Sequence, residues 1–414
     1  MAPSSSTDGP GAGLPASAEP PREEQHAGQP QLIPPPLSLY VHLPWCVRKC
    51  PYCDFNSHQG KGALPFEAYV DALIRDLDLD LPLVWGRGIH SVFFGGGTPS
   101  LFPPEAIERF LQAASARLRF APGCEITLET NPGTAEHGRF DQYLRAGVNR
   151  LSFGIQSFDD GCLQRLGRIH DSAQAAAAVK LAQDAGFDNI NLDLMYALPG
   201  QDLEMALNDL ERAFALDPAH VSHYQLTLEP NTVFFARPPA GIPEEDDAWD
   251  IQEACQAALA QAGYAHYEVS AYARPDRQCA HNLNYWRYGD YLGIGAGAHG
   301  KITLGAEQTI LRRWKHKHPV TYLQTAGTAA AIGGDDRIAP KRRPFEYMLN
   351  LLRLREGFAL RDFSARTGLA PEFIAPALQQ ALARGWLEQQ DGRIVPTELG
   401  RRFTNDVVEL FLGS

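Results

Sequence analysis

The sequence predicts an α/β fold: a partial (β/α)6 barrel with a C-terminal winged-helix-like α+β domain. Three observations lead to this prediction. Apolar runs alternate with helical patterns over residues 37–228, three cysteines fall in one short loop after the first run, and short helices with a hairpin follow residue 340. At 414 residues the chain exceeds the size at which one hydrophobic core usually stops growing, so more than one domain is expected.

Six apolar runs are typical of buried strands, and segments with helical spacing separate them. The strands are predicted at 37–42, 91–94, 124–130, 149–155, 189–194 and 220–228. The longer helices are predicted at 66–81, 104–118, 173–185 and 203–216, with a short helix between the third and fourth strands. This alternation predicts parallel βαβ units with right-handed crossovers. A curved open sheet is favoured and a flat doubly wound sheet is the alternative; in both, ligands bind at the carboxyl ends of the strands.

Changes in composition divide the chain into four parts. Residues 1–36 are rich in Pro, Ser, Ala and Gly and cannot bury enough apolar surface to offset their ordering entropy, so a disordered tail is predicted. Residues 37–240 form the predicted barrel, and residues 241–340 an extension with a helix at 248–262 and a strand near 267–269. The part from 341 to 414 is predicted to hold helices at 345–354, 360–367 and 372–384, a hairpin turning at Asp391-Gly392, and a closing helix at 397–412. The helix in the DNA-recognition position lacks a basic face, which indicates a packing or partner-docking role.

Charge and hydropathy exclude several classes of protein. The net charge of −12 gives no attraction to nucleic acid or to an anionic membrane surface. No apolar run approaches the ~18 residues of a transmembrane helix, and the N-terminus lacks the basic start and apolar core of a secretory signal. Of the seven cysteines, three share one loop and four are scattered, so a reducing cytoplasm is predicted rather than a disulfide framework.

The three cysteines of the loop are the strongest chemical signal. Cys46, Cys50 and Cys53 are spaced so that their thiolates can converge on one small inorganic body. Three thiolates leave one iron of a 4Fe–4S cluster without a protein ligand, and an open coordination site is typical of a working metal centre. A Cys3His zinc site with His42 or His58 is the alternative, although zinc ligands more often come as two separated pairs.

Polar residues follow the ends of the later predicted strands. Gly95-Gly96-Gly97-Thr98 follows the second strand, where bare backbone lets a ligand approach closely; a tight turn is the alternative for a lone glycine-rich loop. The side chains expected on the same rim are Glu129, Gln156, Arg168, Asp193 and Thr227. Each alone could be a helix cap, a surface ion-pair partner or a plain loop residue, but their shared position favours a binding site.

The cysteine loop resembles the C-x3-C-x2-C signature of the radical S-adenosylmethionine (SAM) enzymes. The words around it, Tyr-Val-His-Leu-Pro-Trp-Cys and Cys-Pro-Tyr-Cys-Asp-Phe-Asn-Ser-His, resemble the branch that holds the oxygen-independent coproporphyrinogen oxidases and the HemW haem chaperones. The resemblance implies that Cys46, Cys50 and Cys53 hold a 4Fe–4S cluster whose open iron chelates SAM and whose electron cleaves it. The residues implied to contact SAM or flank the cluster are Tyr40, Tyr52, Gly96, Gly97, Thr98, Glu129, Gln156, Arg168, Asp193 and Thr227. In the oxidases some of these positions touch a second SAM, and whether one binds here is left open.

A second motif, at Cys279–Trp286, resembles the His-Asn-x-x-Tyr-Trp motif of the HemW branch. Histidine is a ligand that haem iron accepts, and Tyr285 and Trp286 could flank a flat macrocycle. The resemblance therefore implies haem ligation by His281 from an accessible loop, whereas the residues alone favour a hydrogen-bonded histidine under two packed aromatics. Cys279 is expected to be a free buried cysteine.

Three functions compete. The first is a haem chaperone that delivers haem to respiratory haem proteins, and the second is an oxygen-independent coproporphyrinogen III dehydrogenase. The third is a zinc-stabilised scaffold with a partner-binding C-terminus. The oxidases carry a fourth cysteine where this chain has Phe55, and they have a shaped N-terminal extension where residues before Leu37 are featureless, so the chaperone is favoured. A SAM-cleaving site is expected, no catalytic residue beyond the cofactor contacts is assigned, and the resemblance leaves a homodimer open.

Overall fold

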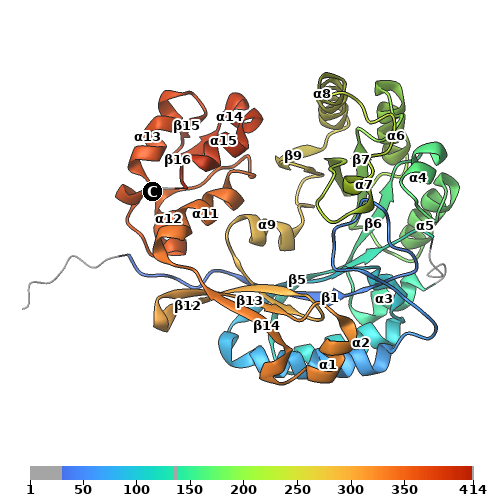
Figure 1. Ribbon diagram of the computed structural model, residues 1–414, viewed down its shortest axis with the longest axis horizontal. Coiled ribbons are helices and arrows are strands. Elements are labelled where there is room, and N and C mark those ends of the chain that lie inside the picture. The colour runs from blue at the N-terminus through green and yellow to red at the C-terminus, as the bar shows by residue number, and fades with distance from the viewer. Residues whose placement is uncertain (1–29, 134–138, 413–414) are drawn as a thin grey trace, which may run out of the picture.

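Six parallel strands form the centre of the computed structural model, which describes residues 30–133 and 139–412. In sheet order they are β1 (Leu37–Leu43), β4 (Gly88–Gly96), β5 (Arg119–Thr130), β6 (Arg150–Gln156), β7 (Ile190–Tyr196) and β8 (His220–Gln225). Every neighbouring pair among them is parallel, which confirms the predicted βαβ units. The sheet curves into an open crescent (Figure 1), which confirms the partial barrel over the flat sheet.

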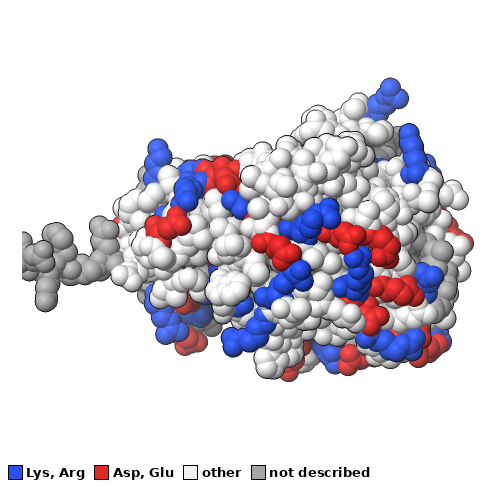
Figure 2. Space-filling view, turned by 90° about the horizontal axis from the view of Figure 1, so that it is seen from below, with Lys and Arg blue, Asp and Glu red and all other residues white. Residues whose placement is uncertain are grey.

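Helices cover the convex side of this crescent (Figure 1). They are α1 (Phe66–Asp80), α2 (Pro104–Ser115), α3 (Phe140–Ala146), α4 (Asp160–Arg165), α5 (Ser172–Asp184), α6 (Leu203–Phe214) and α8 (Glu245–Gln261), with α7 (Val233–Ala236) near the rim. Their apolar faces and the strands share one buried core, as expected when an amphipathic helix returns over a sheet. On the face shown in Figure 2, acidic and basic side chains are intermixed, so no large patch of one sign lies there.

The extension adds strands to both edges of the barrel, of which the sequence predicted one. β9 (Ala265–Glu268) and β10 (Ala271–Ala273) follow β8, while β11 (Asp290–Ile294), β12 (His299–Leu304), β13 (Thr309–Lys315) and β14 (Ile332–Arg337) continue the sheet beyond β1. β11 pairs in parallel with β1, so the edge of the barrel next to the cysteine loop is covered. Helix α10 (Pro319–Thr325) packs against α1.

The C-terminal part has its own hydrophobic core. It contains α11 (Arg343–Leu351), α12 (Leu360–Thr367), α13 (Ala375–Ala383), the hairpin β15 (Leu387–Gln390) and β16 (Arg393–Pro396), α14 (Glu398–Arg402) and α15 (Thr404–Glu409). The hairpin turns at Asp391-Gly392 as predicted. The closing helix does not run unbroken from 397 to 412, because it is interrupted at Phe403 between α14 and α15.

The predicted tail of residues 1–36 lies outside the described residues up to residue 29. Its last part differs from the prediction, because Leu32 is buried in the C-terminal core and its backbone N–H donates to Gln308 Oε1 at 2.8 Å. The Ile33 N–H also donates to the Ala365 carbonyl at 2.8 Å, so one buried side chain and two backbone hydrogen bonds hold this segment. Among the described helices, none is long and apolar enough to cross a membrane.

Candidate functional site

The cysteine loop leaves the carboxyl end of β1 and is closed by two short parallel strands, β2 (Trp45–Cys46) and β3 (His58–Gln59). All three thiols are free and half-buried. The N–H of Cys53 donates to the carbonyl of Cys50 at 3.2 Å, which makes the tight turn expected from the short spacing. The loop therefore presents three thiols from one compact backbone segment.

Asn56 fastens the end of this loop to the extension. Its Nδ2 donates to the carbonyl oxygens of Ala296 and Lys317, both at 2.9 Å. Its own carbonyl oxygen lies 2.9 Å from His42 Nε2, and His42 Nδ1 lies 3.0 Å from the Tyr40 hydroxyl. Both ring nitrogens of His42 are thus engaged in hydrogen bonds.

The zinc alternative gains no support from this geometry. His42 has no free ring nitrogen, and His58 Nε2 lies 3.2 Å from Asn56 Oδ1. Among the described residues, no group of three or more His, Cys, Asp or Glu side chains is placed to hold a single metal ion. The three thiols line a cavity of about 420 Å³ together with many other residues.

Except for Tyr40, the residues predicted to contact SAM line the same cavity from several strands. Besides the three cysteines, its wall includes Tyr52, Gly96, Gly97, Thr98, Glu129, Gln156, Arg168, Asp193 and Thr227. They come from the carboxyl ends of parallel strands or the loops after them, except Asp193, which lies in the middle of β7. Their SAM-binding roles stay predictions, but the structure does bring them together.

Gly96, at the end of β4, and Gly97 after it both pack closely against other parts of the protein. A Cβ at Gly96 would lie 2.5 Å from the His42 imidazole, and one at Gly97 would lie 2.5 Å from the carbonyl oxygen of Trp45. Gly96 also has a φ of +117°, which other residues rarely adopt. A side chain at Gly96 would therefore displace the His42 ring, although Gly96 also lines the cavity as the sequence predicts.

Glu129 and Asp193 place two carboxyl groups in the cavity wall. Glu129 Oε2 accepts a hydrogen bond from the Gly96 N–H at 3.2 Å. Burial, and secondly the nearby Asp193 carboxylate, raise the pKa of Glu129 to about 8. Asp193 accepts hydrogen bonds from Ser152 Oγ at 3.0 Å and Asn191 Nδ2 at 2.8 Å, which oppose the rise that burial imposes on its pKa. Glu129 is thus largely protonated near neutral pH, beside an Asp193 that accepts more hydrogen bonds.

This raised pKa predicts how stability depends on pH. Between the ordinary value of 4.5 and about 8, folded Glu129 holds a proton that the unfolded chain has released. The contribution of Glu129 to stability is fully present below pH 4.5 and is lost as the pH rises through about 8. The free energy of unfolding of cluster-free protein, measured in urea, is expected to fall as the pH rises across this range. For Glu129→Gln this fall should be at least about 1 kcal/mol smaller than for wild type. Identical pH profiles for the two proteins would contradict the assignment.

Arg168 and Gln156 also line this first cavity. Arg168 Nη1 lies 3.5 Å from Cys50 Sγ, and its Nη2 donates to the Gly154 carbonyl. Gln156 accepts from the Tyr224 hydroxyl at 2.7 Å and has a φ of +76°, an uncommon value outside glycine that is often found at functional sites. Arg168 thus places a cation beside the Cys50 thiol.

A second cavity of about 840 Å³ adjoins the first and lies inside the crescent of strands. The two share Gly96, Glu129 and Asp193 among their lining residues, together with Phe55. Its aromatic wall consists of Tyr40, Phe93, Tyr285, Trp286 and Tyr291, and His281 faces it as well. This volume lies within the range of about 300–1,000 Å³ typical of small-molecule and cofactor sites.

His281 does not lie on an accessible loop, as the sequence predicted. It is buried on helix α9 (Ala280–Trp286), 8% exposed, with its ring 4.9 Å from that of Phe93. Its Nδ1 lies 3.2 Å from Ser91 Oγ, which leaves Nε2 for a ligand. Burial, and secondly Arg150, lower the pKa of His281 to about 3, so the imidazole is neutral at physiological pH. Cys279, expected to be a free buried cysteine, is buried and free.

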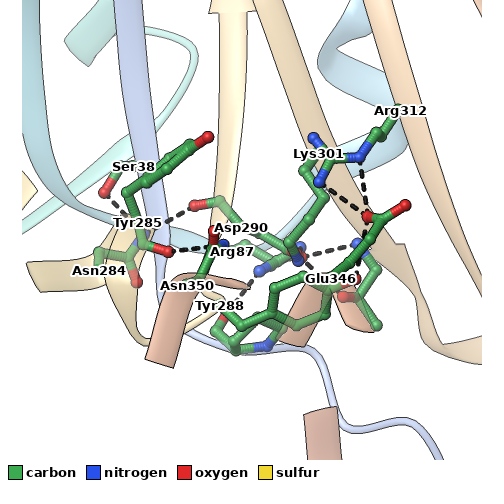
Figure 3. Close-up of polar contacts among 12 residues, drawn as sticks. Ser38, Arg87, Asn284, Tyr285, Tyr288, Asp290, Lys301, Arg312, Glu346 and Asn350 are labelled. Atoms are coloured by element: carbon green, nitrogen blue, oxygen red, sulfur yellow. Dashed lines mark hydrogen bonds and ion pairs between the residues drawn. The ribbon is translucent and has the colours of Figure 1, made fainter. Parts of the chain in front are cut away.

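Helix α9 is held in place at both ends. At its start, Glu125 accepts from the backbone N–H groups of Ala280 and His281, both at 3.2 Å. At its end, Asn284 donates to Ser38 Oγ at 2.9 Å, and Asn350 of the C-terminal domain donates to the Tyr285 carbonyl at 3.3 Å (Figure 3). Long-range contacts of this kind fix the position of a helix of only seven residues.

Several lining residues were not predicted. Met195 and Tyr224 border the first cavity, while Arg150 and Asn191 border the second, and Ser152 borders both. The signal for two of them was present, because residues 150, 152, 154 and 156 alternate along β6 and therefore face the same side of the sheet.

Comparison with known proteins agrees with this architecture. Residues 40–213 match the Radical SAM superfamily, and residues 338–403 match the HemN C-terminal domain. The chain is 50% identical over 378 residues to the heme chaperone HemW of Escherichia coli (strain K12), covering 91% of this chain and 98% of that protein. It is 48% identical over 383 residues to the heme chaperone HemW of Haemophilus influenzae, with the same coverage. The chain belongs to the HemW family of radical SAM proteins.

A solved structure of an oxidase has a fold similar to that of this chain. The coproporphyrinogen III oxidase HemN of Escherichia coli, described as a radical SAM enzyme, superposes with a TM-score of 0.77 over 91% of this chain and 90% of that one. Identity to it is 25%, against 50% to the HemW relative, so the oxidase alternative is not favoured. The cysteine loop of this HemW chain lies within the Radical SAM match.

Proposed function

We propose that this chain is a haem chaperone that holds a 4Fe–4S cluster, SAM and haem in its two adjoining cavities and delivers haem to respiratory haem proteins. The observation that carries the proposal is the shared wall. A cavity lined by three cysteine thiols opens beside a larger, aromatic cavity that contains His281, and Glu129 and Asp193 border both.

The first cavity suits the cluster and SAM. Cys46, Cys50 and Cys53 would supply the three thiolates, and Arg168 would offset part of their negative charge. The SAM contacts would come from Tyr40, Tyr52, Gly96, Gly97, Thr98, Glu129, Gln156, Arg168, Asp193 and Thr227, of which only Tyr40 lines the second cavity alone. A bound cluster would supply an open iron site and an electron for SAM cleavage.

The second cavity suits haem. His281 would supply a neutral ring nitrogen, and Phe93 with Tyr285 and Trp286 would cover the apolar face of a flat ring. His281 would be the histidine ligand of the haem iron. The cavity opens beside Phe55, which is 60% exposed, so bound haem would have an exit route there. A chaperone needs such a route, since it must release what it binds.

We further propose a separate role for each of three parts of the chain. Residues 37–240 hold the cluster and SAM, residues 241–340 complete the haem cavity, and residues 341–414 form a domain that packs on α9 and docks partners. The Asn350 contact to Tyr285 supports this arrangement, because it joins the C-terminal domain directly to the helix that carries His281.

Coproporphyrinogen turnover separates this function from the oxidase. Anaerobically reconstituted protein with SAM and a reductant is expected to convert no coproporphyrinogen III, measured by porphyrin fluorescence after oxidation. The same preparation is expected to bind haem in an optical titration. Catalytic conversion would make the oxidase the correct function.

A further inference from the structure

Arg150 places a buried cation in the wall of the second cavity. It is the first residue of β6, is 2% exposed, and lines the cavity together with His281. Its Nε has no hydrogen-bond partner in the described part of the chain. The ion pair to Glu125 Oε2 is 3.9 Å long, beyond hydrogen-bonding distance. A buried guanidinium without acceptors is costly unless a ligand provides them.

The two carboxylates near Arg150 are already engaged with other donors. Glu125 accepts from the N–H groups of Ala280 and His281 and from the Cys279 thiol. Asp193 accepts from Ser152 and Asn191. Glu125 therefore holds the start of α9, and Asp193 is bonded within the polar interior of the barrel. Neither carboxylate forms with Arg150 the paired hydrogen bonds that a planar guanidinium favours.

We propose that Arg150 binds a carboxylate of the ligand in the second cavity. On the proposed function, on which this inference rests, that group is a propionate of haem. His281 would meet the iron and Arg150 an edge of the macrocycle, so two contacts would fix the orientation of the ring. The guanidinium suits a carboxylate because it can donate two parallel hydrogen bonds.

The test compares haem with its dimethyl ester, which lacks the charged carboxylates. Both are titrated optically into reconstituted full-length wild type and into Arg150→Gln. Wild type is expected to bind haem about tenfold or more tightly than the ester, because hydrogen bonds to charged groups are of this strength. Arg150→Gln is expected to bind haem and ester within about twofold of each other. Its unchanged ester affinity would show that the cavity is intact.

Two controls locate the carboxylate. Lys317→Gln removes another cation that lines the same cavity and is expected to keep the wild-type preference for haem. Calorimetric titration of SAM is expected to give the same affinity for wild type and Arg150→Gln. If SAM binding weakens instead while the haem preference stays, the carboxylate belongs to SAM and the inference is wrong.

Other outcomes separate this inference from the proposed function. Equal wild-type affinities for haem and ester would overturn the role of Arg150 even if the variant failed to fold, because they require no variant. A preference for haem that Lys317→Gln removes and Arg150→Gln retains would also overturn it. Wild type that binds neither haem nor ester would overturn the haem-chaperone proposal itself.

Discussion

Replacing any one of Cys46, Cys50 and Cys53 by alanine is expected to abolish assembly of the 4Fe–4S cluster. The three thiols line one cavity from one short loop, and no further cysteine is among its lining residues in the described part of the chain. Two thiolates would leave two irons without protein ligands, so the cluster should not persist. Iron and sulfide analysis after anaerobic reconstitution should give about four irons per wild-type chain and close to none in each variant.

Cys255→Ala is the matched control for these variants. Cys255 is buried in α8 and lines neither cavity. This variant should lose some stability through the small volume change and still assemble the cluster. Stoichiometric zinc in wild type, without visible iron–sulfur absorbance, would show that the cysteines form a different centre.

His281→Ala is expected to weaken haem binding at least about tenfold, equivalent to about 1.4 kcal/mol, and to change the Soret spectrum. The buried imidazole is neutral because its pKa is lowered to about 3, so a ring nitrogen stays available to iron throughout the physiological range. The iron–sulfur absorbance should be unchanged, because His281 lines only the second cavity. Parallel optical titrations of wild type and variant measure both quantities.

His299→Ala tests whether any histidine of this cavity would serve. His299 also lines the second cavity, but it lies on β12 and is exposed. Its loss should leave haem affinity within about twofold of wild type. If haem binding fails in His299→Ala and survives in His281→Ala, the ligand assignment has to move from α9 to β12.

The central strands were predictable because their physical signal is local. A strand covered by helices on one side and by a polar barrel interior on the other alternates apolar and polar residues, and β1, β6 and β7 each do so. The positions of Glu129 and Gln156 followed from the rule that ligands lie at the carboxyl ends of parallel strands, whereas Asp193 lies in the middle of β7. Chain order and this rule placed them without knowledge of their contacts.

The missed features depend on contacts between residues far apart in the sequence. Helix α9 has only seven residues and is defined by Glu125 and Asn350, each distant along the chain. Strand β11 contains a glycine and joins the sheet through its pairing with β1. Glycine is needed at position 96 because the His42 ring packs closely against its backbone, and no local sequence pattern reveals this contact. Tertiary packing decided each of these, and propensity did not.

Haem transfer tests the central claim most directly. Reconstituted protein carrying one haem is freed of excess haem and mixed with the apo form of a respiratory haem protein, and the two are separated at intervals to measure where haem lies. The account predicts that the acceptor fills faster than haem escapes to a protein scavenger in a parallel sample. Haem that stays on the chain, or reaches the acceptor only at the scavenger rate, would contradict delivery by this protein.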